Sequence, residues 1–378
     1  MTRTIAPGAL ARWMGGVAAS SAISNTFAAF KHAPPVDKDS EDALDEAIQL
    51  DHDHAPYWGG GLPNNATIGA GCLAALGQGK RISRWVGQYN QRLKPLTVDD
   101  LAELDMDQLH ASLGCPDAYP DWVRFFRGQL DHQPWAKVLN LWIGRLSPGM
   151  TASAMTGVTR TAHAVRALNR RVSELRLEEL ARSLAWWAAT YHPLVYQTDD
   201  NVQKRSIQQA FLQLPTLKPH IKPKKGSLTT GVMTLEHLPG FGPVIDWIEI
   251  TNPSEMISEI TRSLADIYLE QSKTSPRIVF ATAIASTSIT RYLTPYLDQK
   301  SASQLMRHLW QSVAALVSAY RDPQTSQLEE SFKEIPLQEL LKDTDNVHAL
   351  KLIDACEREH IITPNPAFQK VASDFCQA

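Results

Sequence analysis

Apolar positions recur every three or four residues over most of this chain, which is the pattern of amphipathic helices. The clearest stripe consists of Val158, Ala162, Val165 and Leu168, and it predicts a helix over residues 151–168. Further helices are expected at residues 41–50, 66–76, 120–130, 135–147, 184–191, 260–268, 305–316 and 346–359. The pattern therefore predicts an all-α protein.

Two local features refine this prediction. Residues 278–289 are rich in Ile, Val and Thr, residues that favour strands, so the sequence leaves this element open between helix and strand. Ser254 follows Asn252-Pro253 and is of the residue type that caps helix N-termini, so it is expected to cap the helix after it.

The helical pattern is interrupted once, over residues 213–245, which hold five prolines and four glycines. A connection of this length is usually functional or mobile, and it would serve as a lid or simply wrap the surface. We therefore expect a single large helical domain over residues 37–378, in which this connection joins two helical halves. Residues 1–36 are expected to be a flexible segment before that domain.

Composition narrows the class of protein. The chain has 378 residues, a net charge of −3 and 43% hydrophobic residues, which is enough apolar material for a sizeable core. Its mild acidity argues against nucleic-acid binding, which normally requires a basic face. The sequence has no apolar stretch of the ~18–20 residues that a membrane span needs.

The four cysteines indicate the compartment. They are widely spaced and form no C-x-x-C pair, which favours a reducing environment and a cytoplasmic protein. The first 36 residues contain no Asp or Glu, so an organelle-targeting segment is the alternative.

The sequence contains few motifs that indicate a catalytic or cofactor-binding mechanism. The sequence contains no P-loop, no G-x-S-x-G and no H-E-x-x-H. The run from Gly69 to Ala74 has the loose G-x-G-x-x-A form, but without a preceding strand it indicates helix packing. A metal site built from His52, His54 or His163 stays open. His348 and Lys351 are three residues apart on a predicted helix, so their side chains share a face.

Four segments, in this order, resemble the questin oxidase-like family. L-P-N-N-A-T-I at residues 62–68, with C-L-A-A-L-G at 72–77, is similar to the family's F-x-N-H-x-P-M and A-L-x-x-L-G. P-G-M at 148–150 through T-G-V-T-R-T-A-H-A-V-R-A-L at 156–168 resembles P-G…T-H-G-x-I-R-T-A-H-A-V-R-A-L. A-T-A-I-A at 281–285, with Arg291 and Pro295, and V-H-A-L-K-L at 347–352 resemble V-H-A-V-T-x-P-x-A-x-R…P and E-H-A-I-K-L.

The resemblance implies a mostly helical oxygenase-type enzyme that acts on anthraquinone-type polyketides. Such enzymes are associated with NADPH, or with non-haem iron held by histidines and a carboxylated lysine. Where the family has histidines, this chain has Asn65, Thr156 and Thr282, and only His348 and Lys351 match. Amide and hydroxyl oxygens are weak iron ligands compared with imidazole, so no metal site is predicted.

The resulting function hypotheses belong to different classes. The first is an oxidoreductase that acts on a polycyclic aromatic compound, with an altered or absent iron site. The second is a metal-free enzyme that uses Lys351 and His348 for acid–base or amine chemistry, and the third is a non-catalytic binder of a small hydrophobic ligand. A helical scaffold without a ligand is the fourth. In the enzyme hypotheses the substrate contacts are Asn65, Thr156, Thr282 and His163.

Overall fold

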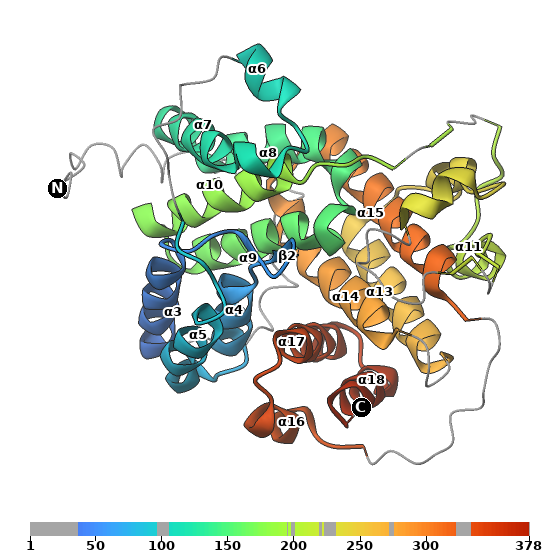
Figure 1. The fold of residues 1–378 in the computed structure, drawn as a ribbon. Helices are drawn as coiled ribbons and strands as arrows, with labels where there is room; N and C mark the ends of the chain where they lie inside the picture. The colour runs from blue at the N-terminus through green and yellow to red at the C-terminus, as the bar shows by residue number, and fades with distance from the viewer. Residues whose placement is uncertain are drawn as a thin grey trace.

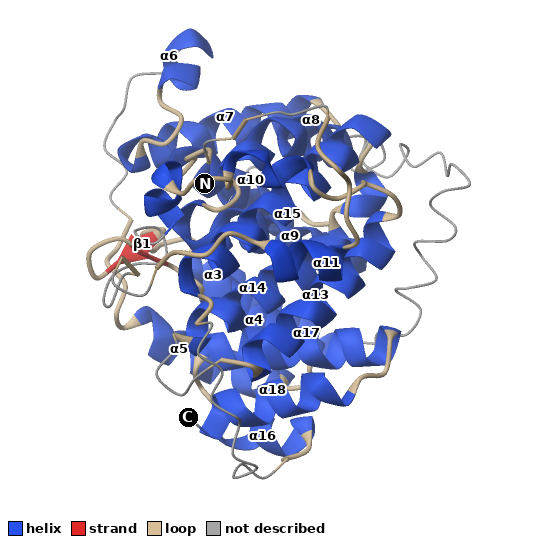
Figure 2. Cartoon of the chain, turned by 90° about the vertical axis from the view of Figure 1, so that its right-hand side faces the viewer, coloured by secondary structure: helices blue, strands red, loops and turns tan. Residues whose placement is uncertain are grey.

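The computed structural model describes residues 37–96, 106–194, 196–197, 201–218, 221–222, 232–271, 276–322 and 334–377. Within these ranges almost all regular structure is helical, so the all-α prediction is confirmed (Figures 1 and 2). In chain order the helices are α3 (Lys38–Asp51), α4 (Ala66–Ala75), α5 (Ile82–Asn90), α6 (Met106–Ala111), α7 (Tyr119–His132), α8 (Trp135–Leu146), α9 (Thr156–Arg170), α10 (Glu174–Ala189), α11 (Ile207–Gln213), α13 (Pro253–Leu269), α14 (Arg277–Ile289), α15 (Gln299–Tyr320), α16 (Leu337–Asp343), α17 (Val347–Ile362) and α18 (Pro366–Gln377).

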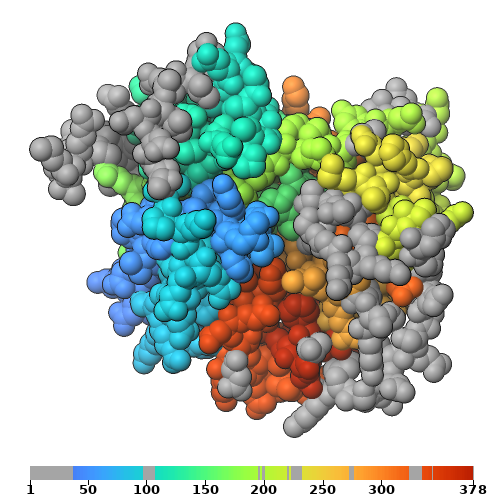
Figure 3. Space-filling view, viewed as in Figure 1, coloured from blue at the N-terminus to red at the C-terminus, as the bar shows by residue number. Residues whose placement is uncertain are grey.

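Four helices form the ring on which the rest is built. α4 packs against α9, α9 against α14, α14 against α17, and α17 against α4. Figure 2 shows these four in the middle of the molecule, and α3, α5, α10, α13 and α18 pack on their outer sides. In Figure 3 the N-terminal helices in blue lie beside the C-terminal helices in red, which is how the two ends of the chain close the ring.

The central position of α14 explains why its sequence is ambiguous. Its residues 279–289 are all buried, because α9, α13, α15 and α17 surround it. A helix covered on every side shows no polar face, so its sequence carries no helical period. Tertiary packing therefore decides the open element at 278–289 in favour of a helix.

The start of α9 differs from the prediction. The helix begins at Thr156 instead of residue 151, because Ser153, Ala154 and Met155 have φ of 50°, 54° and 60°. These three residues form one left-handed turn inside the segment η4 (Ala152–Met155). Left-handed helical backbone costs roughly 1–2 kcal/mol per non-glycine residue, and such strain clusters at functional sites.

Two smaller details were not predicted. Asn252, instead of Ser254, caps α13, since its side chain accepts a 3.0 Å hydrogen bond from the Ser254 N–H. Before α4 the chain forms a short hairpin of β1 (Tyr57–Trp58) and β2 (Leu62–Pro63). Its turn, residues 59–61, consists of glycines that all have positive φ.

Parts of the Pro/Gly-rich connection lie against α15. It contains the 3-10 helices η5 (Thr234–His237) and η6 (Gly242–Asp246), both of which contact α15. The Trp310 indole N–H donates to the Val244 carbonyl oxygen at 2.7 Å. Of the two roles considered, these contacts favour wrapping the surface. Residues 219–220 and 223–231 lie outside the described residues, as does the predicted flexible or targeting segment 1–36.

The helix-packing interpretation of Gly69 is confirmed. It lies inside α4, and a Cβ at this position would overlap the Trp85 ring on α5. Of the helices in the described ranges, none is both long and apolar enough to cross a membrane.

Gly157 provides a test of how tightly α9 packs against α10. A Cβ at Gly157 would lie 2.7–2.9 Å from Trp187 on α10, so Gly157→Ala is expected to destabilise the protein by about 1–3 kcal/mol. Urea unfolding measures the difference in the free energy of unfolding between this variant and the parent protein. Gly128→Ala on α7 is the matched control: no atom lies within 4 Å of its Cβ position, so a gain of roughly 1 kcal/mol is expected. Equal midpoints for the two variants would show that α9 and α10 can separate freely.

Candidate functional site

A charged layer lies in the middle of the ring. Ligand-type atoms of Cys72 on α4, His163 on α9 and Asp354 on α17 all lie within 4.8 Å of one another. The Asp354 carboxylate accepts hydrogen bonds from Arg166 at 2.9 Å and from Arg358 at 3.0 Å. Arg166 also donates to Nδ1 of His163 at 3.0 Å. We call these five residues the charged layer.

The charged layer does not suit a metal ion, although thiolate, imidazole and carboxylate are typical zinc ligands. Burial raises the pKa of the Cys72 thiol and so keeps it protonated. Burial, together with Arg166, holds the pKa of His163 well below its usual value, while the Arg166 hydrogen bond occupies its Nδ1 lone pair. Arg166 and Arg358 both bind the single carboxylate of Asp354, so the charged layer carries a net positive charge that repels a metal cation. His163, predicted to contact substrate, therefore serves to anchor Arg166 in this layer.

The helical repeat relates the other predicted residues to this layer. Asn65 precedes Cys72 by seven residues, and Thr156 precedes His163 by seven. Seven residues are two helical turns, so each lies on the same side of its helix about 10 Å nearer the N-terminus. Lys351 lies one turn before Asp354 on α17.

Thr282 is placed by a direct contact between α9 and α14. The Thr159 hydroxyl donates to the Ser286 hydroxyl oxygen at 2.8 Å. Thr156 lies one turn before Thr159, and Thr282 lies one turn before Ser286. The two predicted threonines therefore lie on the facing sides of adjacent helices.

Contacts farther along the helices show that α4, α9 and α14 progress in the same direction. Thr67 and Arg160 both bind Glu179, and one to two turns later Arg166 donates to the Gly71 carbonyl oxygen at 2.7 Å. After the Thr159–Ser286 contact, Arg166 lies 5.6 Å from the ring centre of Tyr292, just beyond α14. α17 runs the same way, since Trp85, which packs on Gly69, donates to the Asp345 carbonyl oxygen just before α17, whereas Asp354 lies beside Cys72. The N-terminal halves of the four helices therefore lie on one side of the charged layer. We call Asn65, Thr156, Thr282, His348 and Lys351 the upper layer.

Every residue of the upper layer has a polar atom without a described partner. Oδ1 of Asn65 and Nδ1 of His348 are buried and make no hydrogen bond. Within the described part of the chain, no hydrogen bond or ion pair involves the hydroxyls of Thr156 and Thr282 or the amine of Lys351. Only 3–7% of the surface of Asn65, Thr156, Thr282 and Lys351 is exposed. Buried polar groups are normally paired, so the upper layer has unused hydrogen-bonding capacity.

Neighbouring hydroxyls on the same helices show the contrast. Thr161 donates to the Gly157 carbonyl oxygen at 2.9 Å, and Thr290 donates to the Ser286 carbonyl oxygen at 2.7 Å. The Ser288 hydroxyl donates to Glu359 at 2.6 Å. The Thr161 hydroxyl on α9 is therefore paired, whereas on α14 the buried hydroxyl of Thr287 also has no hydrogen-bond partner.

The two titratable groups of the upper layer are both pushed towards neutrality. Burial lowers the pKa of Lys351 to about 8, and Cys72 opposes this shift slightly. Burial, with a contribution from Lys351, lowers the pKa of His348 to about 3. At neutral pH His348 is an uncharged hydrogen-bonding group, and roughly a tenth of Lys351 is a neutral amine.

The upper layer does not fit the cofactors that the family resemblance implies. Among its side chains only His348 offers the imidazole nitrogen that Fe(II) prefers, and the Asn65, Thr156 and Thr282 oxygens are weak donors. NADPH binding usually relies on a glycine-rich turn after a strand, but Gly69 lies within a helix and packs on Trp85.

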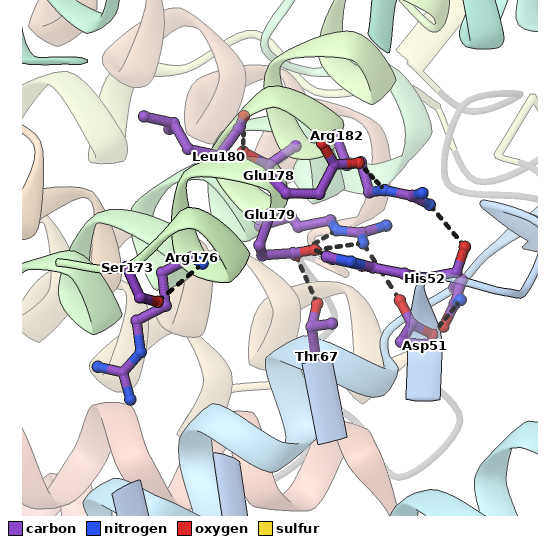
Figure 4. Close-up of polar contacts among 12 residues, drawn as sticks. Asp51, His52, Thr67, Ser173, Arg176, Glu178, Glu179, Leu180 and Arg182 are labelled. Atoms are coloured by element: carbon purple, nitrogen blue, oxygen red, sulfur yellow. Dashed lines mark hydrogen bonds and ion pairs between the residues drawn. The ribbon is translucent and has the colours of Figure 1, made fainter. Parts of the chain in front are cut away.

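A second polar cluster, which sequence reasoning did not find, fixes the start of α4. Arg160 donates to both Glu179 oxygens at 2.7 and 2.8 Å and to Asp51 at 3.2 Å. The Thr67 hydroxyl donates to Glu179 at 2.9 Å, as Figure 4 shows. Asn64 donates to Asp51 at 2.7 Å, so the residue next to Asn65 is held in place. Because these residues are far apart in sequence, only the fold reveals the cluster.

The histidines near this cluster do not form a metal site. Nε2 of His52 lies 3.4 Å from Glu179 (Figure 4), and Nδ1 of His54 lies 2.9 Å from the Leu50 carbonyl oxygen. In the described part of the chain, neither belongs to a group of three potential metal ligands.

One cavity borders these clusters, and another lies away from them. The first, of about 20 Å³, has room for one water molecule, and its lining includes Thr67, Gly71 and His163. The second, of about 90 Å³, lies between Leu194 and Phe241, beside the Pro/Gly-rich connection. Neither His348 nor Lys351 lines either of these two cavities.

Comparisons with known proteins give no family. No family model matches the chain, and the search of curated proteins found no match. The questin oxidase-like resemblance therefore stays a prediction.

Proposed function

We propose that the chain is a metal-independent enzyme that binds a small carbonyl compound at the upper layer and uses Lys351 as base or nucleophile. The observation that supports this most is the unpaired polar atom on each of the five residues from α4, α9, α14 and α17. A ligand with oxygen substituents would supply the missing hydrogen bonds. The resemblance suggests an aromatic compound of the polyketide type.

The roles follow from the chemistry of each side chain. The hydroxyls of Thr156 and Thr282 donate hydrogen bonds to the carbonyl oxygen of the ligand and polarise it. Oδ1 of Asn65 accepts from a phenolic hydroxyl, and neutral His348 offers a further acceptor. The neutral amine of Lys351 either removes an acidic proton or attacks the carbonyl carbon.

The oxidoreductase hypothesis stays a prediction of the resemblance. Without iron, oxygenation would require an organic cofactor or an easily oxidised substrate. Oxygen uptake by metal-free protein in the presence of a polycyclic phenol would support it over the proposal made here.

Binding to the upper layer is testable with threonine-to-valine variants. Thr156→Val and Thr282→Val are each expected to weaken binding of 1,8-dihydroxyanthraquinone by about 2- to 10-fold, the effect of one lost hydrogen bond. An absorbance titration measures the affinity. Thr161→Val is the matched control, since its hydroxyl is already paired within α9. If Thr161→Val weakened binding as much as the other two, or if none bound the quinone, the assignment of the site would be wrong.

A further inference from the structure

We infer that Lys351 is a covalent attachment site, where the lysine amine forms an imine with an aldehyde or ketone ligand. This inference rests on the proposed function and deepens it, because it names the ligand class and the bond that is formed. Its basis is the unusual state of Lys351 among the buried cations of the protein.

Other buried cations of the core are paired with carboxylates. Arg160 binds Glu179, Arg166 binds Asp354, and Arg291 binds Glu359 at 3.0 Å. A buried cation that stabilises a fold needs such a partner. Lys351 is as deeply buried but has no ion pair or hydrogen bond with any residue in the described ranges.

The nearest acid on the same helix is not available to Lys351. Asp354, one turn away, already accepts hydrogen bonds from Arg166, Arg358 and the Cys72 thiol. A protonated Lys351 would add a third cation to this neighbourhood without a new anion. The surroundings therefore raise the fraction of neutral amine with a free lone pair, which is the state that attacks carbonyl carbon.

The reaction needs no external oxidant or reductant. The Nζ lone pair of Lys351 attacks the carbonyl carbon, a C–N bond forms, and the C=O π electrons move to oxygen. The oxygen takes up a proton and the nitrogen loses one, giving a carbinolamine. Loss of its hydroxyl with one proton releases water and leaves the imine. Nδ1 of His348, three residues before Lys351, has no hydrogen-bond partner in the described structure and is free to accept a hydrogen bond from the carbinolamine hydroxyl.

The neutral state of the amine is reflected in the pKa of Lys351, about 8 against 10.5 for a free lysine. At pH 7 this difference leaves roughly 300-fold more neutral amine than on an ordinary lysine. Lys351 should therefore react with a carbonyl compound before exposed lysines do, provided that the compound reaches it.

Reductive trapping of the full-length protein tests the inference. The protein is incubated at pH 7 with glycolaldehyde or 2-hydroxybenzaldehyde and cyanoborohydride, and the adducts are located by peptide mass spectrometry. We expect the first adduct on Lys351, ahead of the exposed control Lys300, and its loss in Lys351→Met. Lys300→Met should retain it. Circular dichroism confirms that each variant is folded.

A parallel binding measurement separates the two proposals. 2-Hydroxybenzyl alcohol, which lacks the carbonyl group, is titrated by calorimetry with the parent protein and with Thr156→Val. If it binds and depends on Thr156 but Lys351 stays unmodified by the aldehydes, the imine inference is wrong and the site remains. If it does not bind and the aldehydes modify only surface lysines, both proposals fail.

Discussion

Replacing Asp354 with Ala is expected to lower the free energy of unfolding by about 3–5 kcal/mol, because the guanidinium groups of Arg166 and Arg358 lose the buried carboxylate they share. Urea unfolding at pH 7 measures this. Glu334→Ala is the matched control. Its partner Lys370 lies 3.8 Å away and both side chains are 45% exposed, so a change below about 1 kcal/mol is expected.

The pKa of Asp354 predicts how the free energy of unfolding changes at acidic pH. Burial opposes the charged form of Asp354, but Arg166 and Arg358 outweigh burial and lower its pKa below the unfolded value of 3.8. A lowered carboxyl pKa stabilises the fold above the unfolded pKa, and this contribution is lost as pH falls below it. Asp354→Asn should therefore flatten the loss of stability below pH ~4. An unchanged acid profile, or a mild effect of Asp354→Ala, would show that the charged layer does not hold the helices together.

Helices were predictable wherever one side is polar and the other is apolar. α9 shows a clear stripe although its residues 156–168 are all buried, because Arg160 and Arg166 on its polar side are paired with buried carboxylates. α14 was ambiguous because residues 278–289 carry no charged side chain, and the left-handed turn at Ser153–Met155 was missed because its residues fit the helical stripe. Its conformation depends on packing against α9 and α14, which no local pattern records.

The residues of the candidate site could be predicted from the sequence, but the layer of the ring to which each residue belongs could not. Asn65, Thr156, Thr282 and Lys351 came from aligned segments, and the helical repeat places all four towards the N-terminal ends of the ring helices. His163 came from the same alignment but belongs to the charged layer, held by Arg166. The charged layer itself could not be predicted, since its members are brought together only by the packing of α4, α9 and α17.

The charged layer and the upper layer have opposite effects on the stability of the ring. In the charged layer, the Asp354 carboxylate is hydrogen-bonded to Arg166 and Arg358, which links α9 to α17 across the ring. In the upper layer, polar groups are buried without partners, which costs stability. A protein retains such a cost where binding or catalysis needs free polar groups.

Lys351→Met provides the sharpest test of this division, because it should raise stability while it abolishes function. Burial lowers the pKa of Lys351 from 10.5 to about 8, so below pH 8 folding must bury a charged ammonium. The shift corresponds to roughly 3 kcal/mol, and methionine of similar length removes that penalty. We expect Lys351→Met to be more stable than the parent by about this amount at pH 7.

The pH dependence of this gain identifies its cause. The unfolded chain binds more protons at Lys351 than the folded chain between pH 8 and 10.5, so the parent becomes more stable as pH rises through that window. The advantage of Lys351→Met should therefore shrink from pH 8 to 10.5 and vanish above it, and the exposed Lys300→Met serves as the control. Denaturant unfolding across this range measures both. If Lys351→Met were less stable than the parent at pH 7, the lysine would be a structural element of the ring, and the unpaired amine would lose its functional meaning.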